Sequence, residues 1–132
     1  MPIVGLEDKW QITAIVGTSL DGTLLPPQLL YEGLTPRFHP QVRLPSGWDI
    51  WHSQNHWSNE GTMLRFVDKV LVPCLEKRRK EIDARPTQHA LLVFDVFKSH
   101  STPQVLEKLK GSRVEVTFVP GNCTGELFDI YE

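Results

Sequence analysis

The chain has 132 residues, a net charge of −2 and an apolar fraction of 40%, values that are typical of a soluble globular domain and that exclude wholesale disorder. Its length predicts one domain, 1–132, with a core of ordinary size. The weakly acidic balance excludes a basic domain that coats nucleic acid, so any contact with DNA would depend on local patches or on a separate domain.

The sequence carries no recognisable export or membrane signal. We find neither a basic leader followed by an apolar core nor an apolar run of about eighteen residues, so we expect no membrane association. Cys74 and Cys123 do not form a CxxC pair. They are typical of reduced thiols in a cytosolic or nuclear protein.

The first predicted element is a β-hairpin. Residues 10–20 form an apolar run rich in β-branched residues, and residues 23–31 form a second such run. Asp21-Gly22 between them suits the positive φ angles of a tight turn. Pro26-Pro27 cannot donate ladder hydrogen bonds, which predicts an edge or a bulge in the return strand.

Residues 32–58 are rich in proline and glycine and predict a long irregular segment, which is often functional in a compact domain. Its second half holds Trp48, Trp51 and Trp57. These aromatic side chains could form a stacking platform for nucleic-acid bases. We favour the alternative, in which they cover the helix that follows, because aromatic side chains dominate core burial. His52 and His56 could share a metal on a helix, but no further zinc ligands lie nearby, which argues against zinc.

Residues 59–82 predict the long helix of the domain. Ser58 or Asn59 can cap it, and Pro73 is expected to kink it. Its apolar face comprises Met63, Phe66, Val67, Val70, Leu71, Cys74 and Leu75. The charged end, 76–81, could contact DNA phosphates or act as a nuclear address. We favour a solvated helix end whose cations interact with the helix dipole.

Residues 90–97 (ALLVFDVF) are typical of a strand that is buried on both faces, with Asp95 as its one ionisable side chain. A carboxylate in such a place is costly unless it is paired, and strand ends that keep one often bind a hard metal through oxygen. The alternative is an Asp that turns the corner after the strand. The local pattern alone leaves both open.

A short helix over 102–110, ended by Gly111, and an alternating strand over 114–119 complete the order. A strand–helix–strand unit implies a parallel pair with a right-handed crossover. We therefore predict an α/β fold with a single mixed sheet and flanking helices. In this sheet the strand that bears Asp95 is expected beside the strand within 10–20.

Four segments in this order resemble the DDE superfamily endonuclease domain, and within it the transposases of the pogo, Tigger and jerky-like kind. They read PIVGLEDKWQITAIVGTSLDGTLLPPQLLYEG, HPQVRLPSGWDIWHSQNHWSNEGTM, LLVFDVFKSH and VTFVPGNCTGEL. The resemblance implies a ribonuclease H-like fold and metal-dependent cleavage and strand transfer of DNA. Three acidic residues would bind two Mg²⁺ (or Mn²⁺) ions, which activate the attacking hydroxyl and stabilise the leaving oxygen.

The resemblance places the second acid on Asp95 and makes Asp129 the nearest candidate for the third, with Glu126 as an outsider. The first acid is expected on a central strand upstream of PIVGLEDK, and the chain begins just before that point. Asp8 and Asp21 occupy turn positions of the family and do not replace it. The domain is therefore expected to be partial, without its first strand, and residues 1–132 alone are expected to cleave little DNA.

Two functions follow from this resemblance. The first is a DDE-type transposase or endonuclease domain that acts on transposon ends or genomic DNA. The second is a non-catalytic remnant that binds nucleic acid or another protein, which an incomplete acidic triad would favour. Either role implies a nuclear protein. The oligomeric state is left open by the sequence.

Overall fold

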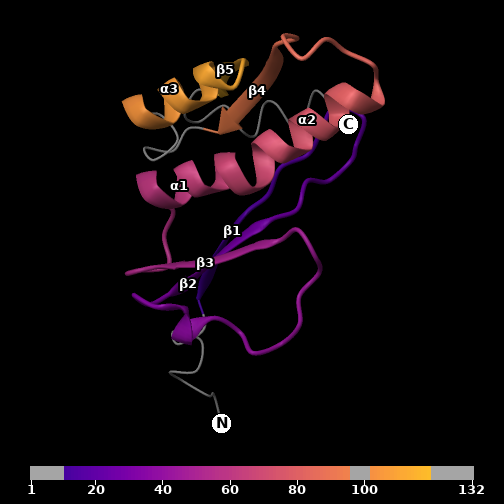
Figure 1. Ribbon diagram of the computed structural model, residues 1–132. Helices are drawn as coiled ribbons and strands as arrows, with labels where there is room; N and C mark the ends of the chain where they lie inside the picture. The colour runs from indigo at the N-terminus through magenta and orange to yellow at the C-terminus, as the bar shows by residue number, and fades with distance from the viewer. Residues whose placement is uncertain (1–10, 96–101, 120–132) are drawn as a thin grey trace.

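The computed structural model describes residues 11–95 and 102–119 of the chain (Figure 1). The strands are β1 (Ile12–Ile15), β2 (Gln28–Glu32), β3 (Asp49–Ser53), β4 (Ala90–Asp95) and β5 (Val114–Val119). The helical elements are η1 (Pro36–Phe38), α1 (Glu60–Phe66), η2 (Val67–Leu71), α2 (Val72–Glu81) and α3 (Pro103–Gly111). None of the helices in the described ranges is long and apolar enough to cross a membrane.

The predicted hairpin is confirmed. Strands β1 and β2 pair antiparallel, with Ile12 opposite Tyr31, and β3 then pairs parallel to β2. Regular pairing is shorter than the apolar runs, because Pro26-Pro27 supplies no backbone donors and only a single bridge joins Thr18 to Leu24. Gly22 adopts φ 88°, as the turn requires. The sheet order is β1-β2-β3, so β3 is an edge strand.

The predicted long helix is confirmed as three consecutive segments. Asn59 caps α1, and its side chain accepts from Thr62 N while the Thr62 hydroxyl accepts from Asn59 N, both at 2.9 Å. The expected distortion at Pro73 takes the form of η2, a π-helical turn that ends just before α2. Such a turn relieves the clash between a proline ring and the preceding turn of backbone.

The predicted strand–helix–strand unit is also confirmed. Strands β4 and β5 are parallel neighbours, and Asp95 lies opposite Val119. The bounds of β5 are those expected from its alternating sequence. Arg79 of α2 links this unit to the helix, because its guanidinium donates to the carbonyl oxygens of Gln88 (2.9 Å) and Arg113 (3.4 Å).

The core forms between the long helix and the β4–α3–β5 unit. Its buried members are Met63, Phe66, Val67, Val70, Leu71, Phe94, Val105, Leu109 and Val114. Ile15 and Leu25 of the hairpin pack against its margin. The apolar face of the long helix is therefore buried, as its helical periodicity predicts. Burial of this face is the main contribution to the stability of the domain.

The expectation of one mixed sheet is wrong for the described residues. The strands form two separate sheets, β1-β2-β3 and β4-β5, and β4 does not pair with β1. In the view of Figure 1 the long helix runs between the two sheets. Each sheet packs against that helix, and β1 and β4 each pair with one other strand among the described residues, so the described contacts do not require β1 and β4 to meet.

The expectation that the Asp95 strand is buried on both faces is wrong as well. Phe94 is buried, whereas Leu91 and Val93 are 70% and 56% exposed. The reason is that the described helices pack on one face of β4, the face that carries Phe94. Alternate residues point to opposite faces of a strand, so Leu91, Val93 and Asp95 share the exposed face.

The two faces of this unit predict different sensitivities to the same substitution. Leu109→Ala should lower the free energy of unfolding by about 2–5 kcal/mol, because Leu109 is wholly buried and its removal leaves a cavity. Leu91→Ala, at an exposed position, should cost less than about 1 kcal/mol. Chemical denaturation followed by circular dichroism measures both values. Equal losses would contradict the assignment of the buried face.

Candidate functional site

Asp95 is the candidate site residue that the structure describes. It is the last residue of β4, at the carboxyl end of a parallel strand pair, and its side chain is exposed to solvent. Buried Phe94 beside it stacks on Phe118 of β5, with ring centroids 6.0 Å apart. This aromatic pair fixes the end of the strand. Ligands of α/β sheets commonly bind at such carboxyl ends.

The other candidate acids, Asp129 and Glu126, lie outside the described residues, as does Asp8, which was not expected to replace the first acid. Within 11–95 and 102–119, no three His, Cys, Asp or Glu side chains cluster in a way that could hold a metal ion. Asp95 has the oxygen chemistry that Mg²⁺ prefers, but a single carboxylate does not make a magnesium site. The described residues therefore fit one ligand of such a site and not a complete one.

Asp21 has a structural role in the hairpin loop, as its turn position predicts. Its carboxylate accepts hydrogen bonds from the Ser19 hydroxyl and from the backbone N–H of Thr23. These hydrogen bonds, first that of Ser19, lower the pKa of Asp21 to about 2. Arg78 of α2 lies 3.6 Å from the same carboxylate, which draws the loop toward the long helix.

A buried polar network that the sequence analysis missed joins the three-stranded sheet to α1. Asp49 is 5% exposed and accepts from Arg65 Nε at 2.8 Å and from Gln28 Nε2 at 2.8 Å. Gln28 is wholly buried and also donates to the carbonyl oxygen of Thr62. The charge of the Asp49 carboxylate is thus neutralised by Arg65, and its hydrogen bonds join β3 to α1 and to β2. No local sequence pattern predicts this network, because its members are far apart in sequence.

An aromatic and histidine cluster surrounds this network at the edge of the sheet. The Arg65 guanidinium lies 3.8 Å from the centroid of the Trp51 ring, a cation–π contact. His52 stacks on Trp51, and His39 lies against both rings. His39 Nε2 and His52 Nδ1 are 2.9 Å apart, within hydrogen-bonding distance.

The expectations for the tryptophans and histidines have mixed outcomes. Trp51 covers α1 through Arg65, as expected, whereas Trp57 is 59% exposed.

His52 and His56 do not lie on a helix. His52 lies in β3, and His56 follows in a turn with φ 57° and contacts the Thr13 hydroxyl at 3.2 Å. The helical arrangement that would have placed both histidines on one face is therefore not present.

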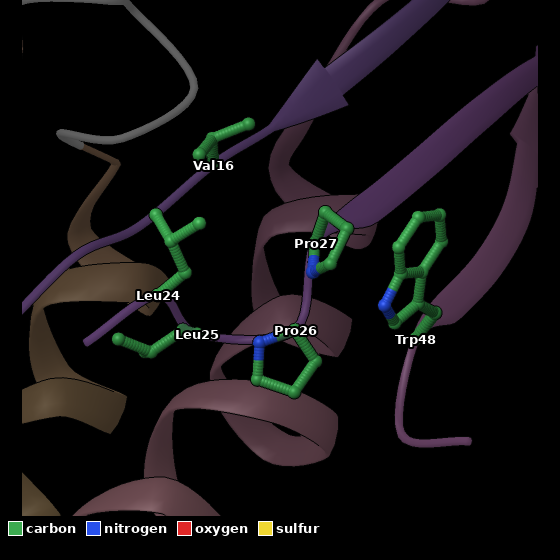
Figure 2. A pocket seen from close by; sticks show the side chains of 6 residues that line it. All are labelled: Val16, Leu24, Leu25, Pro26, Pro27 and Trp48. Atoms are coloured by element: carbon green, nitrogen blue, oxygen red, sulfur yellow. The ribbon is translucent and has the colours of Figure 1, made fainter. Parts of the chain in front are cut away.

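A shallow apolar hollow opens beside the hairpin, and Figure 2 shows its six lining residues. Its volume is about 330 Å³, and its lining comprises Val16, Leu24, Leu25, Pro26, Pro27 and Trp48. All six are apolar in character and none is ionisable. The hollow can therefore accept an apolar group, but it offers no chemistry for catalysis.

The comparison with protein families agrees with the resemblance found in the motifs. Residues 9–128 match the DDE superfamily endonuclease family, so the match spans most of the chain, including the Asp95 strand. The chain belongs to the DDE superfamily endonuclease family.

Curated relatives point to the pogo branch. The chain is 28% identical over 121 residues to the human protein "Pogo transposable element with KRAB domain", and equally to its mouse counterpart. The alignment covers 92% of this chain and 18% of each relative, so the chain spans about a fifth of their length. No solved structure matches the chain.

The buried network predicts a clear contrast between two acidic residues. Asp49→Ala should cost about 2–3 kcal/mol of unfolding free energy, because it leaves Arg65 and Gln28 without their shared acceptor. The loss is below that of a fully buried pair, since the Arg65 side chain is 28% exposed.

Asp68→Ala is the matched control. Asp68 pairs with Lys108 at the same distance, 2.8 Å, but both side chains are at least one-third exposed. Such a surface pair contributes less than about 1 kcal/mol. Urea denaturation of both variants measures the difference, and similar losses would show that burial of Asp49 does not matter.

Proposed function

We propose that this chain is part of the catalytic core of a DDE-type transposase or endonuclease, which cleaves DNA phosphodiester bonds and transfers strands. Membership of the DDE superfamily endonuclease family supports the class. The observation that supports a catalytic role for one particular residue is the position of Asp95. It is an exposed carboxylate at the carboxyl end of a parallel strand pair.

In this proposal Asp95 binds a divalent cation, Mg²⁺ or Mn²⁺, together with Asp129. Val119 lies opposite Asp95, so β5 ends beside the end of β4, and Asp129 follows Val119 ten residues later in the sequence. When bound, the metal ions would supply activation of the attacking hydroxyl and neutralisation of the leaving oxygen. In this proposal Asp95 holds the metal ion at the carboxyl end of β4. The stacked rings of Phe94 and Phe118 keep the ends of β4 and β5 in place.

We further propose that the two described sheets are parts of one ribonuclease H-like sheet. In that fold a central strand carries the first acid and lies between the strands that correspond to β1 and β4. Both β1 and β4 are edge strands in the described residues. The outer side of each has no strand partner among the described residues, as expected of two strands that flank a further strand.

A second candidate is a non-catalytic remnant that binds nucleic acid or a protein. Both candidates imply DNA as the partner of the parent family and a location in the nucleus. The relatives named for a pogo transposable element support this direction.

Titration with Mn²⁺ tests the role of Asp95 without depending on activity. Paramagnetic broadening in NMR spectra should centre on residues around Asp95 and Val119, at the carboxyl ends of β4 and β5. Asp95→Asn should reduce this broadening strongly, because it removes a charged oxygen ligand. Asp21→Asn is the matched control, since it removes an exposed carboxylate on the hairpin and should leave the broadening at β4 unchanged.

Broadening that centres on His52 and His56, or that survives Asp95→Asn, would mean that Asp95 only shapes the strand end. Nicking of supercoiled DNA by the protein in its natural length then separates the two candidates. A catalytic core predicts metal-dependent nicking that Asp95→Asn lowers by at least about 100-fold, because changes in groups that merely orient metal ligands already cost about 10–100-fold. Metal-independent DNA binding without nicking would favour the remnant.

A further inference from the structure

Two histidines from different elements meet at β3. His39 follows η1 in the connection between β2 and β3, and His52 lies within β3. His39 Nε2 and His52 Nδ1 are 2.9 Å apart. The ring of His39 also contacts Tyr31 and Trp51, with centroids at 6.3 and 5.8 Å. His39 therefore links the connecting segment, residues 33–48, to both β2 and β3.

A hydrogen bond between two imidazoles needs one nitrogen that carries a proton and one that does not. One positive charge in the pair is compatible with this bond, because a protonated ring can donate to a neutral one. Two charges are not, because both facing nitrogens would then be donors. A tetrahedral metal ion, with bonds to imidazole of about 2.0–2.1 Å, would hold the two nitrogens about 3.3 Å apart. The observed separation is shorter and suits a shared proton.

The charges around the pair oppose a second proton. Arg65 of α1 and His52 of β3 face His39, and Asp49 of β3 offsets them only in part, because its carboxylate is already paired with Arg65. The ring of Tyr31 of β2 packs against His39 from the neighbouring strand. Burial, followed by the charges of His52 and Arg65, lowers the pKa of His39 below the ordinary value of 6.5.

We propose that the His39–His52 pair is a pH-sensitive latch that docks segment 33–48 on β2 and β3 and opens when both imidazoles are protonated. In the docked state His39 contacts Tyr31 and His52, which are cross-strand neighbours of β2 and β3. Opening of the latch releases these contacts. The latch is independent of the proposed catalytic role of Asp95, which lies on the other sheet.

The direction of the pH dependence follows from the docked and undocked states of segment 33–48. His39 has a lowered pKa when docked and regains a value near 6.5 when undocked, so the undocked state binds the proton more readily. Docking is therefore fully favourable above about pH 6.5 and weakens as the pH falls below it. One proton changes the docking constant by up to about tenfold per pH unit.

Hydrogen–deuterium exchange of the protein between pH 7.5 and 5 tests the latch, with rates corrected for the intrinsic effect of pH. We expect the protection of backbone amides in 33–48 to fall by up to about tenfold per pH unit below about 6.5. Protection of α3 and β5 should not change. His39→Gln places an amide near the position of Nε2, and this group can bond His52 without titrating. In this variant the protection of 33–48 should not depend on pH.

His56→Asn is the matched control. His56 contacts only the Thr13 hydroxyl among the hydrogen bonds found for its ring, and its φ of 57° suits Asn. This variant should keep the pH dependence of the parent protein. Protection that is independent of pH in the parent, or equally pH-dependent in His39→Gln, would overturn the proposal. Should His39→Gln fail to fold, imidazole ¹⁵N NMR of the parent decides, because a titration midpoint of His39 at or above 6.5 would also overturn it.

Discussion

The apolar face of the long helix is the constraint on which the rest of the described structure depends. Met63, Val67 and Val70 are almost wholly buried, and the helix contacts the hairpin sheet on one side and the β4–α3–β5 unit on the other. Within residues 11–95 and 102–119, neither sheet has more than three strands. Small sheets gain independent stability only by packing on another layer, so the helix provides the surface that both need.

Polar contacts determine how the elements are placed relative to one another within this apolar packing. An apolar face can slide along a sheet at little cost, whereas the Asp49 carboxylate accepts from Arg65 and Gln28 only in one relative placement of β3 and α1. The Asn59 capping box fixes where α1 begins, and Arg79 fixes where α2 ends against the loop before β4. The hydrophobic contacts thus supply most of the stability, and these few hydrogen bonds select the arrangement.

Local patterns in the sequence predicted most of the elements and their order, but the expectation that 32–58 is irregular is wrong, because β3 (Asp49–Ser53) lies within it and pairs with β2. The hairpin, the capped helix and the alternating strand 114–119 depend on neighbours within a few residues, and the structure has all three. The two separate sheets and the exposed face of β4 depend on contacts between distant segments, which no local pattern encodes. The same distinction applies to the site: the strand-end position of Asp95 could be predicted, whereas the partners of Asp49 and His52 could not. Asp129 lies outside the described residues.

The π-helical turn η2 has a consequence for how this chain tolerates changes in length. A π turn holds one more residue than the α-helical turn that it replaces. Deletion of one residue within Val67–Leu71 therefore restores a regular turn without rotating the residues that follow, because both kinds of turn complete one circuit of the helix axis. Arg79 would still point toward the carbonyl oxygens of Gln88 and Arg113. A deletion within α2 before Arg79 has no extra residue to remove and would rotate the residues that follow by about 100°, so the helix should tolerate a one-residue deletion better in η2 than in α2.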